Sequence, residues 1–503
     1  MTWFVRDMEQ GYILAIDQGT TGTKVIAFNH QGEIVATANR ELTQHYPHPG
    51  WVEHDPEEIW RVSLDVIGTA LADGKIDARD ISAIGITNQR ETTVLWDRHT
   101  GEPVYNAIVW QCRRTAPYCD ELKARGLEDL VKRKTGLVID AYFSATKIRW
   151  LLDNVPGVKE RAQRGDLLFG TIDSWLVWKL TGGRVHITDY TNASRTMLFD
   201  IHHFTWDEEV IREMEIPPQV LPEVRSSSEV YGFTAGNDVL PSGIPIAGIA
   251  GDQQASLFGQ ACFTPGMAKN TYGTGCFPLL NLGREAVSSA GGLLTTIACG
   301  GDGKPVYAVE GAIFNTGTAI QWLRDGLGII SEAKDSETLA RKVEDTGGVH
   351  LVPAFTGLGA PYWDMHARGA ILGITRGTRK EHIVRAALES IAYQSRDVLE
   401  IMAQDARGGI EKLRVDGGGA ANDVLLQFQA DILGIAIERP VIAETTALGA
   451  AYLAGLATGY WRDADEVSSL WRLGARFEPK MDAEKREHLY SEWRRAVSRV
   501  LSD

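Results

Sequence analysis

The sequence is poor in the features that mark secreted and disulfide-stabilised proteins. Its 503 residues include only five cysteines, and these are scattered and form no C-x-x-C pair. An odd number of dispersed cysteines is typical of reduced thiols in a cytoplasmic protein rather than of a disulfide framework. The N-terminus also lacks the charged region, apolar run and small-residue cleavage site of a signal peptide, so secretion is not expected.

Long apolar runs and an excess of positive charge are also missing. The longest uncharged stretch near the C-terminus, residues 445–461, is interrupted by threonine and glycine. It falls short of the ~18 consecutive apolar residues that predict a membrane span, and it is expected to form a buried helix. Lys and Arg total 51 against 66 Asp and Glu, a net charge of -15 at pH 7. This balance argues against a nucleic-acid partner, because such partners are held by clustered cations, and it favours a small molecule.

What the sequence does contain indicates two α/β domains. A chain of 503 residues exceeds the ~250–300 residues at which one hydrophobic core stops growing. Strand-like and helix-like segments alternate along it, which favours an α/β fold. The apolar strands 12–16 and 24–29 are separated by a short turn and predict a β-hairpin, whereas a P-loop joins a strand to a helix.

A similar Gly/Thr turn recurs between two strands within residues 269–277, as a duplicated domain would produce. The boundary is expected near residue 258, after the strand 244–249 and the short helix that Asp252 introduces. The predicted domains are therefore residues 1–258 and 259–503. No long Pro/Ser linker separates them, so we expect them to pack closely and to move about a hinge.

Three glycine-rich turns could bind phosphate or nucleotide. In the first, residues 17–24, backbone N–H groups, hydroxyls and Lys24 suit a polyphosphate, and Asp17 could hold a hydrated Mg²⁺. The second is 273–275. The third, 417–419, precedes a helix over 422–433, and its glycines would let a ligand approach the backbone. A plain hairpin tip is the alternative for the first turn, because Gly, Thr and Asp are common in turns.

Two polar segments could hold and activate a substrate hydroxyl. Asp252 lies where a strand ends and a helix begins, which makes it a candidate general base, although an N-cap is the alternative. Arg90 and Glu91 lie in a loop between the strands 81–87 and 93–97. They form either a surface ion pair or a polyol site in which Arg donates and Glu accepts hydrogen bonds.

These residues belong to a recognisable pattern. The segments 142–154 and 369–389 match the two signature segments of the sugar-kinase family that includes glycerol, xylulose and gluconate kinases, and the chain resembles this family over essentially its full length. Within the family, the segments 17–21, 88–92, 109–114 and 251–254 are most similar to those of glycerol kinases.

The resemblance implies two actin-like or ribonuclease-H-like domains with an active site in the cleft between them. It implies ATP and Mg²⁺ as cofactors, glycerol as substrate, Asp252 as general base and Asp17 as the residue that orients Mg²⁺ through water. Glycerol would be held by Arg90, Glu91, Tyr142, Asp252 and Gln253 and covered by Trp110 and Phe277. ATP would contact Thr20, Thr21, Gly22, Lys24, Thr274, Gly317, Gln321, Gly418 and Asn422. A homo-oligomer, either a dimer or a tetramer, is also implied.

The first turn departs from the family pattern, which often has Ser-Ser-Arg where this chain has Gly22-Thr23-Lys24. Lys keeps the charge but not the bidentate fork of Arg. Three alternatives stay open at this point: a kinase for another polyol or ketose, an actin-like filament or chaperone ATPase, and a non-catalytic sugar sensor. A kinase for another polyol or ketose would have the same fold, because the fold alone does not determine which substrate is bound.

The segment before the strand that leads to Asp252 bears on regulation. Some bacterial glycerol kinases carry there a Gly-rich loop with an Arg that binds fructose 1,6-bisphosphate, and others carry a His that a phosphocarrier protein phosphorylates. Here the corresponding residues are 231–243, and no Lys, Arg or His occurs from Ser226 to Ala268. Without a cation or a His, neither form of regulation is expected through this segment.

Overall fold

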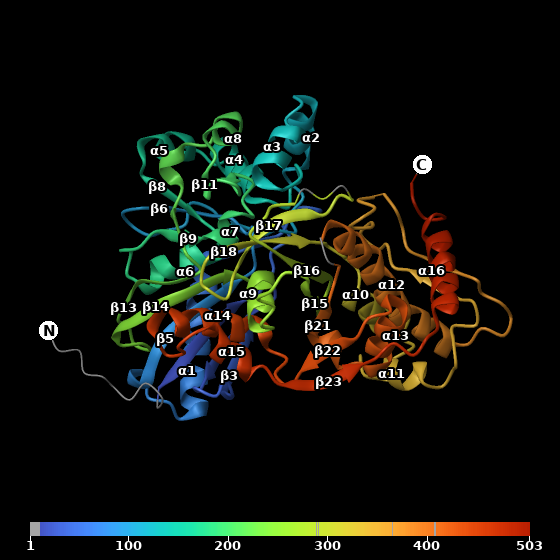
Figure 1. Cartoon of the computed structure of the whole chain (residues 1–503). Coiled ribbons are helices and arrows are strands. Elements are labelled where there is room, and N and C mark those ends of the chain that lie inside the picture. Colours follow the sequence, from blue (N-terminus) through green and yellow to red (C-terminus); the bar gives the residue numbers. More distant parts are fainter. Residues whose placement is uncertain (1–10, 288, 290, 365, 407–408, 503) are drawn as a thin grey trace.

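The protein contains two mixed β-sheets whose strands come from successive halves of the chain (Figure 1). The computed structural model describes residues 11–287, 289, 291–364, 366–406 and 409–502. The first sheet has the order β13-β14-β5-β1-β2-β3, and the second β17-β18-β16-β15-β21-β22-β23. The strands of the first are β1 (Tyr12–Gln18), β2 (Gly22–Phe28), β3 (Ile34–Glu41), β5 (Ile81–Asn88), β13 (Ser228–Ala235) and β14 (Ser242–Gly251). Those of the second are β15 (Met267–Tyr272), β16 (Cys276–Gly283), β17 (Leu294–Cys299), β18 (Pro305–Glu310), β21 (Lys412–Asp416), β22 (Ile437–Pro440) and β23 (Leu473–Phe477).

The same substructure begins both sheets. β1 and β2 form an antiparallel hairpin, and β5 pairs with β1 in parallel. In the second sheet β15 and β16 form the hairpin, and β21 pairs with β15 in parallel. The two predicted hairpins and the α/β class are therefore confirmed. In each sheet the hairpin turn and the carboxyl end of the parallel strand lie at the same edge, which brings their polar residues together.

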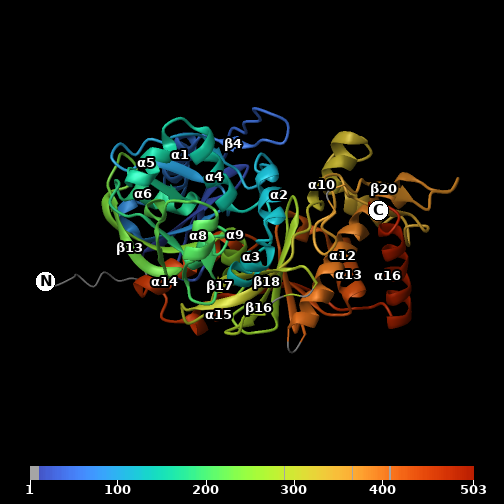
Figure 2. The same cartoon turned by 90° about the horizontal axis from the view of Figure 1, so that it is seen from above.

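Helices cover the sheets and exclude water from the apolar strands. α1 (Pro56–Gly74) packs on β2 and β3, while α12 (Lys380–Asp405) packs on β16 and against α13 (Asp423–Leu433). α10 (Gly317–Gln321) and α11 (Asp335–Ala340) pack against α12, and α16 (Ala483–Val497) packs against α13. Figure 2 shows α10 and α16 on the side away from the first sheet.

The C-terminal part of the chain returns to the first sheet. α14 (Thr445–Thr458) packs against β1, β5, β14 and α9 (Asp252–Gly259), and it is followed by α15 (Ala464–Leu470). Figure 1 shows these two helices, in red, among the blue and green elements. The predicted buried helix over 445–461 is thus present and ends at Thr458. Among the described residues, no helix combines the length and apolarity needed to cross a bilayer.

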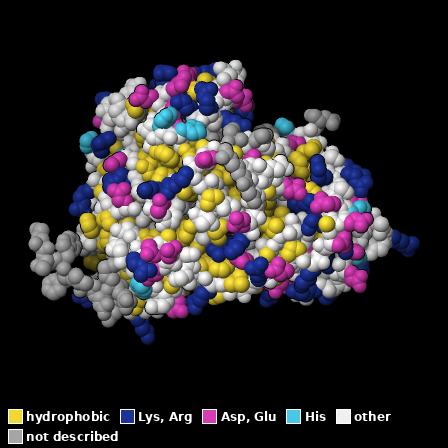
Figure 3. Space-filling view, in the orientation of Figure 1, with side chains coloured by type: hydrophobic (Ala, Val, Ile, Leu, Met, Phe, Trp, Pro, Cys, Tyr) yellow, Lys and Arg dark blue, Asp and Glu magenta, His cyan; other side chains and the backbone are white. Residues whose placement is uncertain are grey.

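A group of short elements is inserted between β5 and β13 and has a hydrophobic core of its own. That core includes residues of α2 (Ala116–Ala124), α3 (Glu128–Thr135), α4 (Ser144–Asn154), α5 (Val158–Arg164) and α8 (Glu208–Glu213). Two more helices of the insertion pack elsewhere: α6 (Ile172–Leu180) in the core of the first sheet and α7 (Tyr190–Ala193) in a smaller cluster. α7 contacts β17 of the second sheet, so the two halves of the chain meet there. On the face in Figure 3, basic and acidic side chains are interspersed over the described residues.

Candidate active site

The first predicted phosphate turn joins β1 to β2. Asp17 lies near the end of β1, Thr20 and Thr21 form the turn, and the Gly19 N–H donates to the Gly22 carbonyl at 2.9 Å. A Cβ on Gly22 would lie 2.5 Å from the Arg40 carbonyl oxygen, so close packing against β3 by itself requires glycine at this position.

Lys24 points to an acidic partner from the far end of the chain. Its Nζ is 2.8 Å from Oε1 of Glu444, the residue before α14, and each side chain is about one-third exposed. The sequence placed Lys24 at the phosphates but gave no sign of this partner, which is 420 residues away. An arriving phosphate would therefore meet a cation that is already paired.

Asp17 lies close to a second carboxylate. Burial and the nearby charge of Asp252 raise the pKa of Asp17 to about 7, and Lys24 opposes the rise. Two carboxylates that repel each other suit a divalent cation, and Mg²⁺ prefers oxygen ligands. The described residues contain no cluster of three or more metal-ligating side chains. The pair thus fits an ion that keeps most of its waters, as Mg²⁺ does when it is bound through one or two carboxylates.

Arg90 is the centre of the predicted polyol site. Its guanidinium is buried, with Nε 3.2 Å from Oδ1 of Asp252. Its Nη2 donates to the Tyr142 hydroxyl at 3.4 Å, and its Nη1 donates to Oε1 of Gln254 at 3.1 Å. Three segments that are distant in the sequence therefore meet at one guanidinium, which rules out the surface ion pair considered above.

Two charged residues that the sequence analysis missed complete this cluster. Glu310, at the end of β18, accepts from Nη1 and Nη2 of Arg90 at 2.5 and 2.9 Å, and from Arg195 Nη2 at 3.0 Å. Arg195 also donates from Nε to Glu91 at 2.7 Å. An acidic residue that ends the apolar run 306–309 is a signal that could have identified Glu310. Arg195 had no comparable signal.

In this cluster the positive charges of Arg90 and Arg195 balance the negative charges of Glu91 and Glu310. Burial raises the pKa of Glu91, against the effect of Arg195, whereas Arg195 and Arg90 hold the pKa of Glu310 below its usual value despite burial. Glu91 also adopts a backbone φ of 62°, which is uncommon for a residue other than glycine and is often found at functional sites. The cluster therefore fixes the positions of the Arg90 and Glu91 side chains, which are expected to bind hydroxyl groups.

Aromatic rings form the apolar side of the same site. The Trp110 ring is 5.5 Å from the Tyr142 ring and 6.4 Å from that of Phe277, which lies on β16. The indole N–H of Trp110 donates to Oγ1 of Thr20 at 2.8 Å, so the rings lie beside the first phosphate turn. Aromatic rings that adjoin the charged groups at Arg90 through Tyr142 suit a small molecule with a carbon side and a hydroxyl side.

Gln253 is also at this site, but another residue already occupies its side-chain oxygen. Its Oε1 accepts a hydrogen bond from Lys269 of β15, which the sequence analysis did not single out. Burial lowers the pKa of Lys269 to about 8. The Gln253 backbone N–H donates to the Asp252 carboxylate at 2.7 Å, as the start of a helix allows.

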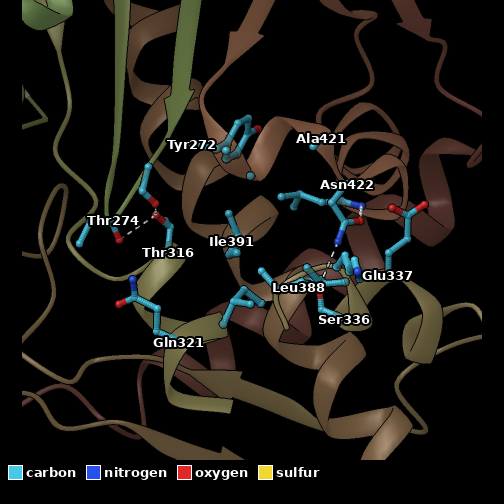
Figure 4. A pocket seen from close by; sticks show the side chains of 18 of the residues that line it. Tyr272, Thr274, Thr316, Gln321, Ser336, Glu337, Leu388, Ile391, Ala421 and Asn422 are labelled. Carbon is cyan, nitrogen blue, oxygen red and sulfur yellow. Dashed lines mark hydrogen bonds between the residues drawn. The ribbon is translucent and has the colours of Figure 1, made fainter. Parts of the chain in front are cut away.

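The second half of the chain contains a cavity of about 480 Å³ (Figure 4). All five residues that were predicted to contact ATP beyond the first turn line it: Thr274, Gly317, Gln321, Gly418 and Asn422. Figure 4 shows Thr274 and Gln321 on one side, Asn422 hydrogen-bonded to Ser336 on the other, and Leu388 and Ile391 between them. An apolar floor with polar groups at both ends suits a nucleoside.

The three adjacent glycines of the third turn have different roles. Gly417 has a φ of 82°, and a Cβ on Gly419 would lie 2.8 Å from the Cβ of Tyr272. A Cβ on Gly418 would meet no atom within 4 Å. Only Gly418 thus leaves open space for a ligand, and the expectation that all three glycines do so is wrong, because the other two are required by the backbone and by packing.

Comparison with known proteins identifies the family. A model of the FGGY family of carbohydrate kinases, N-terminal domain, matches residues 12–259, and the model of its C-terminal domain matches residues 268–458. The chain belongs to the FGGY family of carbohydrate kinases. It is 64% identical over 490 residues to glycerol kinase 2 of Thermotoga maritima, covering 97% of this chain and 99% of that one. It is 63% identical over 493 residues to glycerol kinase of Carboxydothermus hydrogenoformans, covering 98% and 99%.

Solved structures agree with this assignment. Glycerol kinase of Plasmodium falciparum, crystallised with ADP, has a TM-score of 0.91 and 41% identity and covers 98% of this chain and 99% of its own. Xylulose kinase of Lactobacillus acidophilus has a TM-score of 0.86 at 24% identity, with 97% and 98% covered, which shows a shared fold. The FGGY carbohydrate kinases have an actin-like fold of two domains, and the predicted fold is confirmed.

Proposed function

We propose that this protein is a glycerol kinase, which transfers the γ-phosphoryl group of MgATP to glycerol and releases sn-glycerol 3-phosphate and ADP. The observation that carries the proposal is the polyol site itself, where Asp252 and the Tyr142 hydroxyl meet at Arg90 and the Tyr142 ring packs near Trp110, which in turn lies near Phe277. Relatives more than 60% identical over nearly the full chain bear the name glycerol kinase, which supports the same substrate.

Asp252 is the proposed general base. Its side chain is 31% exposed and therefore accessible to a substrate, and Arg90 at 3.2 Å holds its orientation. Asp252 would accept the proton of a terminal glycerol hydroxyl while the oxygen of that hydroxyl bonds to the γ-phosphorus. The bond between the γ-phosphorus and the bridging oxygen to the β-phosphorus breaks, and ADP leaves. Glu91 and Tyr142 would bind the remaining hydroxyls. Gln253 would add a contact through the amide nitrogen that Lys269 leaves free.

The nucleotide is proposed to span the cavity and the first turn. Asn422 and Gly418 lie where the nucleoside would bind, Thr274, Gly317 and Gln321 follow, and Thr20, Thr21 and Lys24 receive the phosphates. Bound Mg²⁺ would neutralise charge on the phosphate oxygens, and Asp17 would hold its waters. Phosphoryl transfer through a loose transition state requires positioning and charge stabilisation, which these backbone and hydroxyl groups supply.

The alternatives account for fewer of these contacts. A filament or chaperone ATPase needs the nucleotide turns, but it gives no reason for a buried cluster in which Arg90, Tyr142 and Asp252 converge. A sensor needs no base. A kinase for another polyol or ketose shares most of the site, so the substrate has to be tested directly.

A coupled assay of ADP release makes this test. Glycerol, dihydroxyacetone, xylulose and gluconate are compared as acceptors, with a sample lacking any acceptor as the control. We expect the highest kcat/KM with glycerol. A higher value with xylulose or gluconate would overturn the substrate, and an equal rate without an acceptor would favour an ATPase.

Three further expectations stay proposals. The domains are proposed to be residues 1–258 and 259–503, the assembly a dimer or tetramer, and the location cytoplasmic. A boundary near residue 258 assigns the two sheets to different domains. It does not do so for every helix, because α14 belongs to the second half of the chain but packs against the first sheet. Light scattering of the purified chain measures its mass, and a monomeric mass would overturn the expected assembly.

A further inference from the structure

The polyol site and the first phosphate turn are joined by hydrogen bonds that the proposed catalytic roles do not use. The Trp110 indole N–H donates to Oγ1 of Thr20 at 2.8 Å. Its backbone N–H donates to Oγ1 of Thr92 at 3.3 Å, and that hydroxyl donates to Oε1 of Gln89 at 2.9 Å. Gln89 in turn donates to the Gly19 carbonyl at 3.2 Å, so the path returns to the turn.

A second layer of buried and partly buried groups supports this path. Gln44 donates to the Thr20 carbonyl at 3.0 Å, His54 Nε2 is 2.9 Å from Oε1 of Gln44, and His54 Nδ1 is 3.4 Å from Nε2 of Gln89. Burial lowers the pKa of His54 to about 4, so its ring is neutral at pH 7, with one nitrogen to donate and one to accept. Both the carbonyl and the hydroxyl of Thr20 are therefore held by residues outside the hairpin.

We infer that Trp110 has a second role, as a positioning residue for the nucleotide: its indole N–H orients the Thr20 hydroxyl, and Thr92 and Gln89 fix the distance between the two loops. This inference rests on the proposed glycerol kinase activity. A threonine hydroxyl has one proton, and when the oxygen accepts from the indole, that proton is directed to another acceptor. The acceptor expected beside this turn is a phosphate oxygen of ATP.

The arrangement makes phosphate alignment depend on the acceptor substrate. The Trp110 ring is half-buried among the rings of Tyr142 and Phe277, and a polyol packed against it would restrict its movement. When the polyol holds the indole in place, the indole keeps the Thr20 hydroxyl oriented, and when the indole can move, this hydroxyl is no longer fixed. ATP alone would then be aligned less well than ATP with a polyol, which disfavours transfer to water.

A double-mutant cycle on the full-length protein tests the inference. Trp110→Phe keeps a ring and removes the N–H, and Thr20→Val keeps the shape and removes the hydroxyl. At saturating glycerol, we expect each change to lower kcat/KM for ATP at least about 3- to 10-fold, the usual effect of one neutral hydrogen bond. The double variant should be no worse than Thr20→Val alone, because the indole acts through that hydroxyl. Effects that multiply would overturn the inference.

Two further variants separate this role from the covering of glycerol. Thr92→Val leaves the indole in place and should also lower kcat/KM for ATP, and an unchanged value would count against the path through Gln89. Trp206→Phe removes an indole hydrogen bond of the same 2.8 Å length, to the Pro222 carbonyl, away from the site. It should keep the wild-type value. A similar loss in this control would show that any indole deletion is damaging, and would overturn the inference.

Calorimetry with ADP distinguishes this inference from the proposed function. If no polyol is phosphorylated, the proposed function is wrong, but the cycle can still be measured as ADP dissociation constants. Non-additive effects of Thr20→Val and Trp110→Phe on ADP binding would support the positioning role. Independent effects would overturn it, whatever the acceptor substrate.

Discussion

Replacing Asp252 with asparagine tests the proposed mechanism most directly. The Oδ1 atom of Asp252 accepts from the Gln253 N–H at 2.7 Å and lies 3.2 Å from Arg90 Nε. An amide oxygen of the same size accepts both hydrogen bonds, so the side chain should keep its place. Arg90 also keeps its bidentate partner Glu310, so no buried cation is left alone. The change therefore removes the basic oxygen and little else.

The expected loss follows from the role of a general base. Proton transfer by a positioned side chain contributes about 10²- to 10⁴-fold to a rate, which corresponds to ~2.7–5.4 kcal/mol. We expect kcat to fall by at least this factor for Asp252→Asn. The apparent constant for glycerol should change much less, because the amide still forms hydrogen bonds with a hydroxyl group.

Steady-state kinetics and glycerol binding by calorimetry measure the two quantities separately. Asp463→Asn is a matched control, since Asp463 also begins a helix and pairs with an arginine, Arg462 at 2.7 Å, outside the site. Its activity should equal that of the wild type. Turnover of Asp252→Asn within a factor of about ten of wild type, or ~1.4 kcal/mol, would refute the assignment of the base.

Three other predictions concern the charges of the site, and a fourth concerns the segment 231–243. Arg90→Ala should raise the apparent Michaelis constant for glycerol far more than that for ATP. An equal increase in both constants would indicate that Arg90 has a structural role only. Asp17→Asn should stabilise the ligand-free protein increasingly between about pH 4 and pH 7, by ~1.4 kcal/mol per pH unit at most, because the raised pKa makes the folded carboxyl costly to ionise. Thermal melts at several pH values check this, and a pH-independent difference would contradict it. Glu444→Gln should leave kcat/KM for ATP within about threefold of wild type, since an exposed ion pair contributes little; a hundredfold loss would contradict this. Titration of fructose 1,6-bisphosphate should leave the rate unchanged, and inhibition abolished by altering residues 233–242 would show that the segment 231–243 binds it.

The elements that the sequence predicted well are those with local signals. Two apolar strands around a Gly/Thr turn indicate a hairpin wherever they occur, and both hairpins are present. The strand, glycine turn and helix around Gly418 likewise follow from periodicity and turn chemistry. Turn chemistry by itself indicated only the glycine-rich turns 273–275 and 417–419, whereas the individual residues of the nucleotide cavity were expected from the resemblance to the sugar-kinase family.

The residues that the sequence did not reveal are partners across long separations. Arg90 and Glu310 are 220 residues apart, and no local pattern relates a loop in the first half to a strand end in the second. The indole of Trp110 and the Thr20 hydroxyl are 90 residues apart and meet only in the folded protein. Tertiary packing decides such pairs, so sequence patterns identify the groups but not their partners.

The two long-range ion pairs should respond differently when substrates bind. Lys24 and Glu444 are each about one-third exposed, and such a pair contributes only about 0–1 kcal/mol, so phosphate can replace Glu444 at little cost. Arg90 and Glu310 are almost fully buried, and separating such a pair costs about 3–5 kcal/mol. Binding energy from a small polyol is more readily spent on ordering the site than on breaking this contact. We therefore expect the contact at Glu310 to persist while the two halves move, and the exposed pair at the phosphate turn to rearrange.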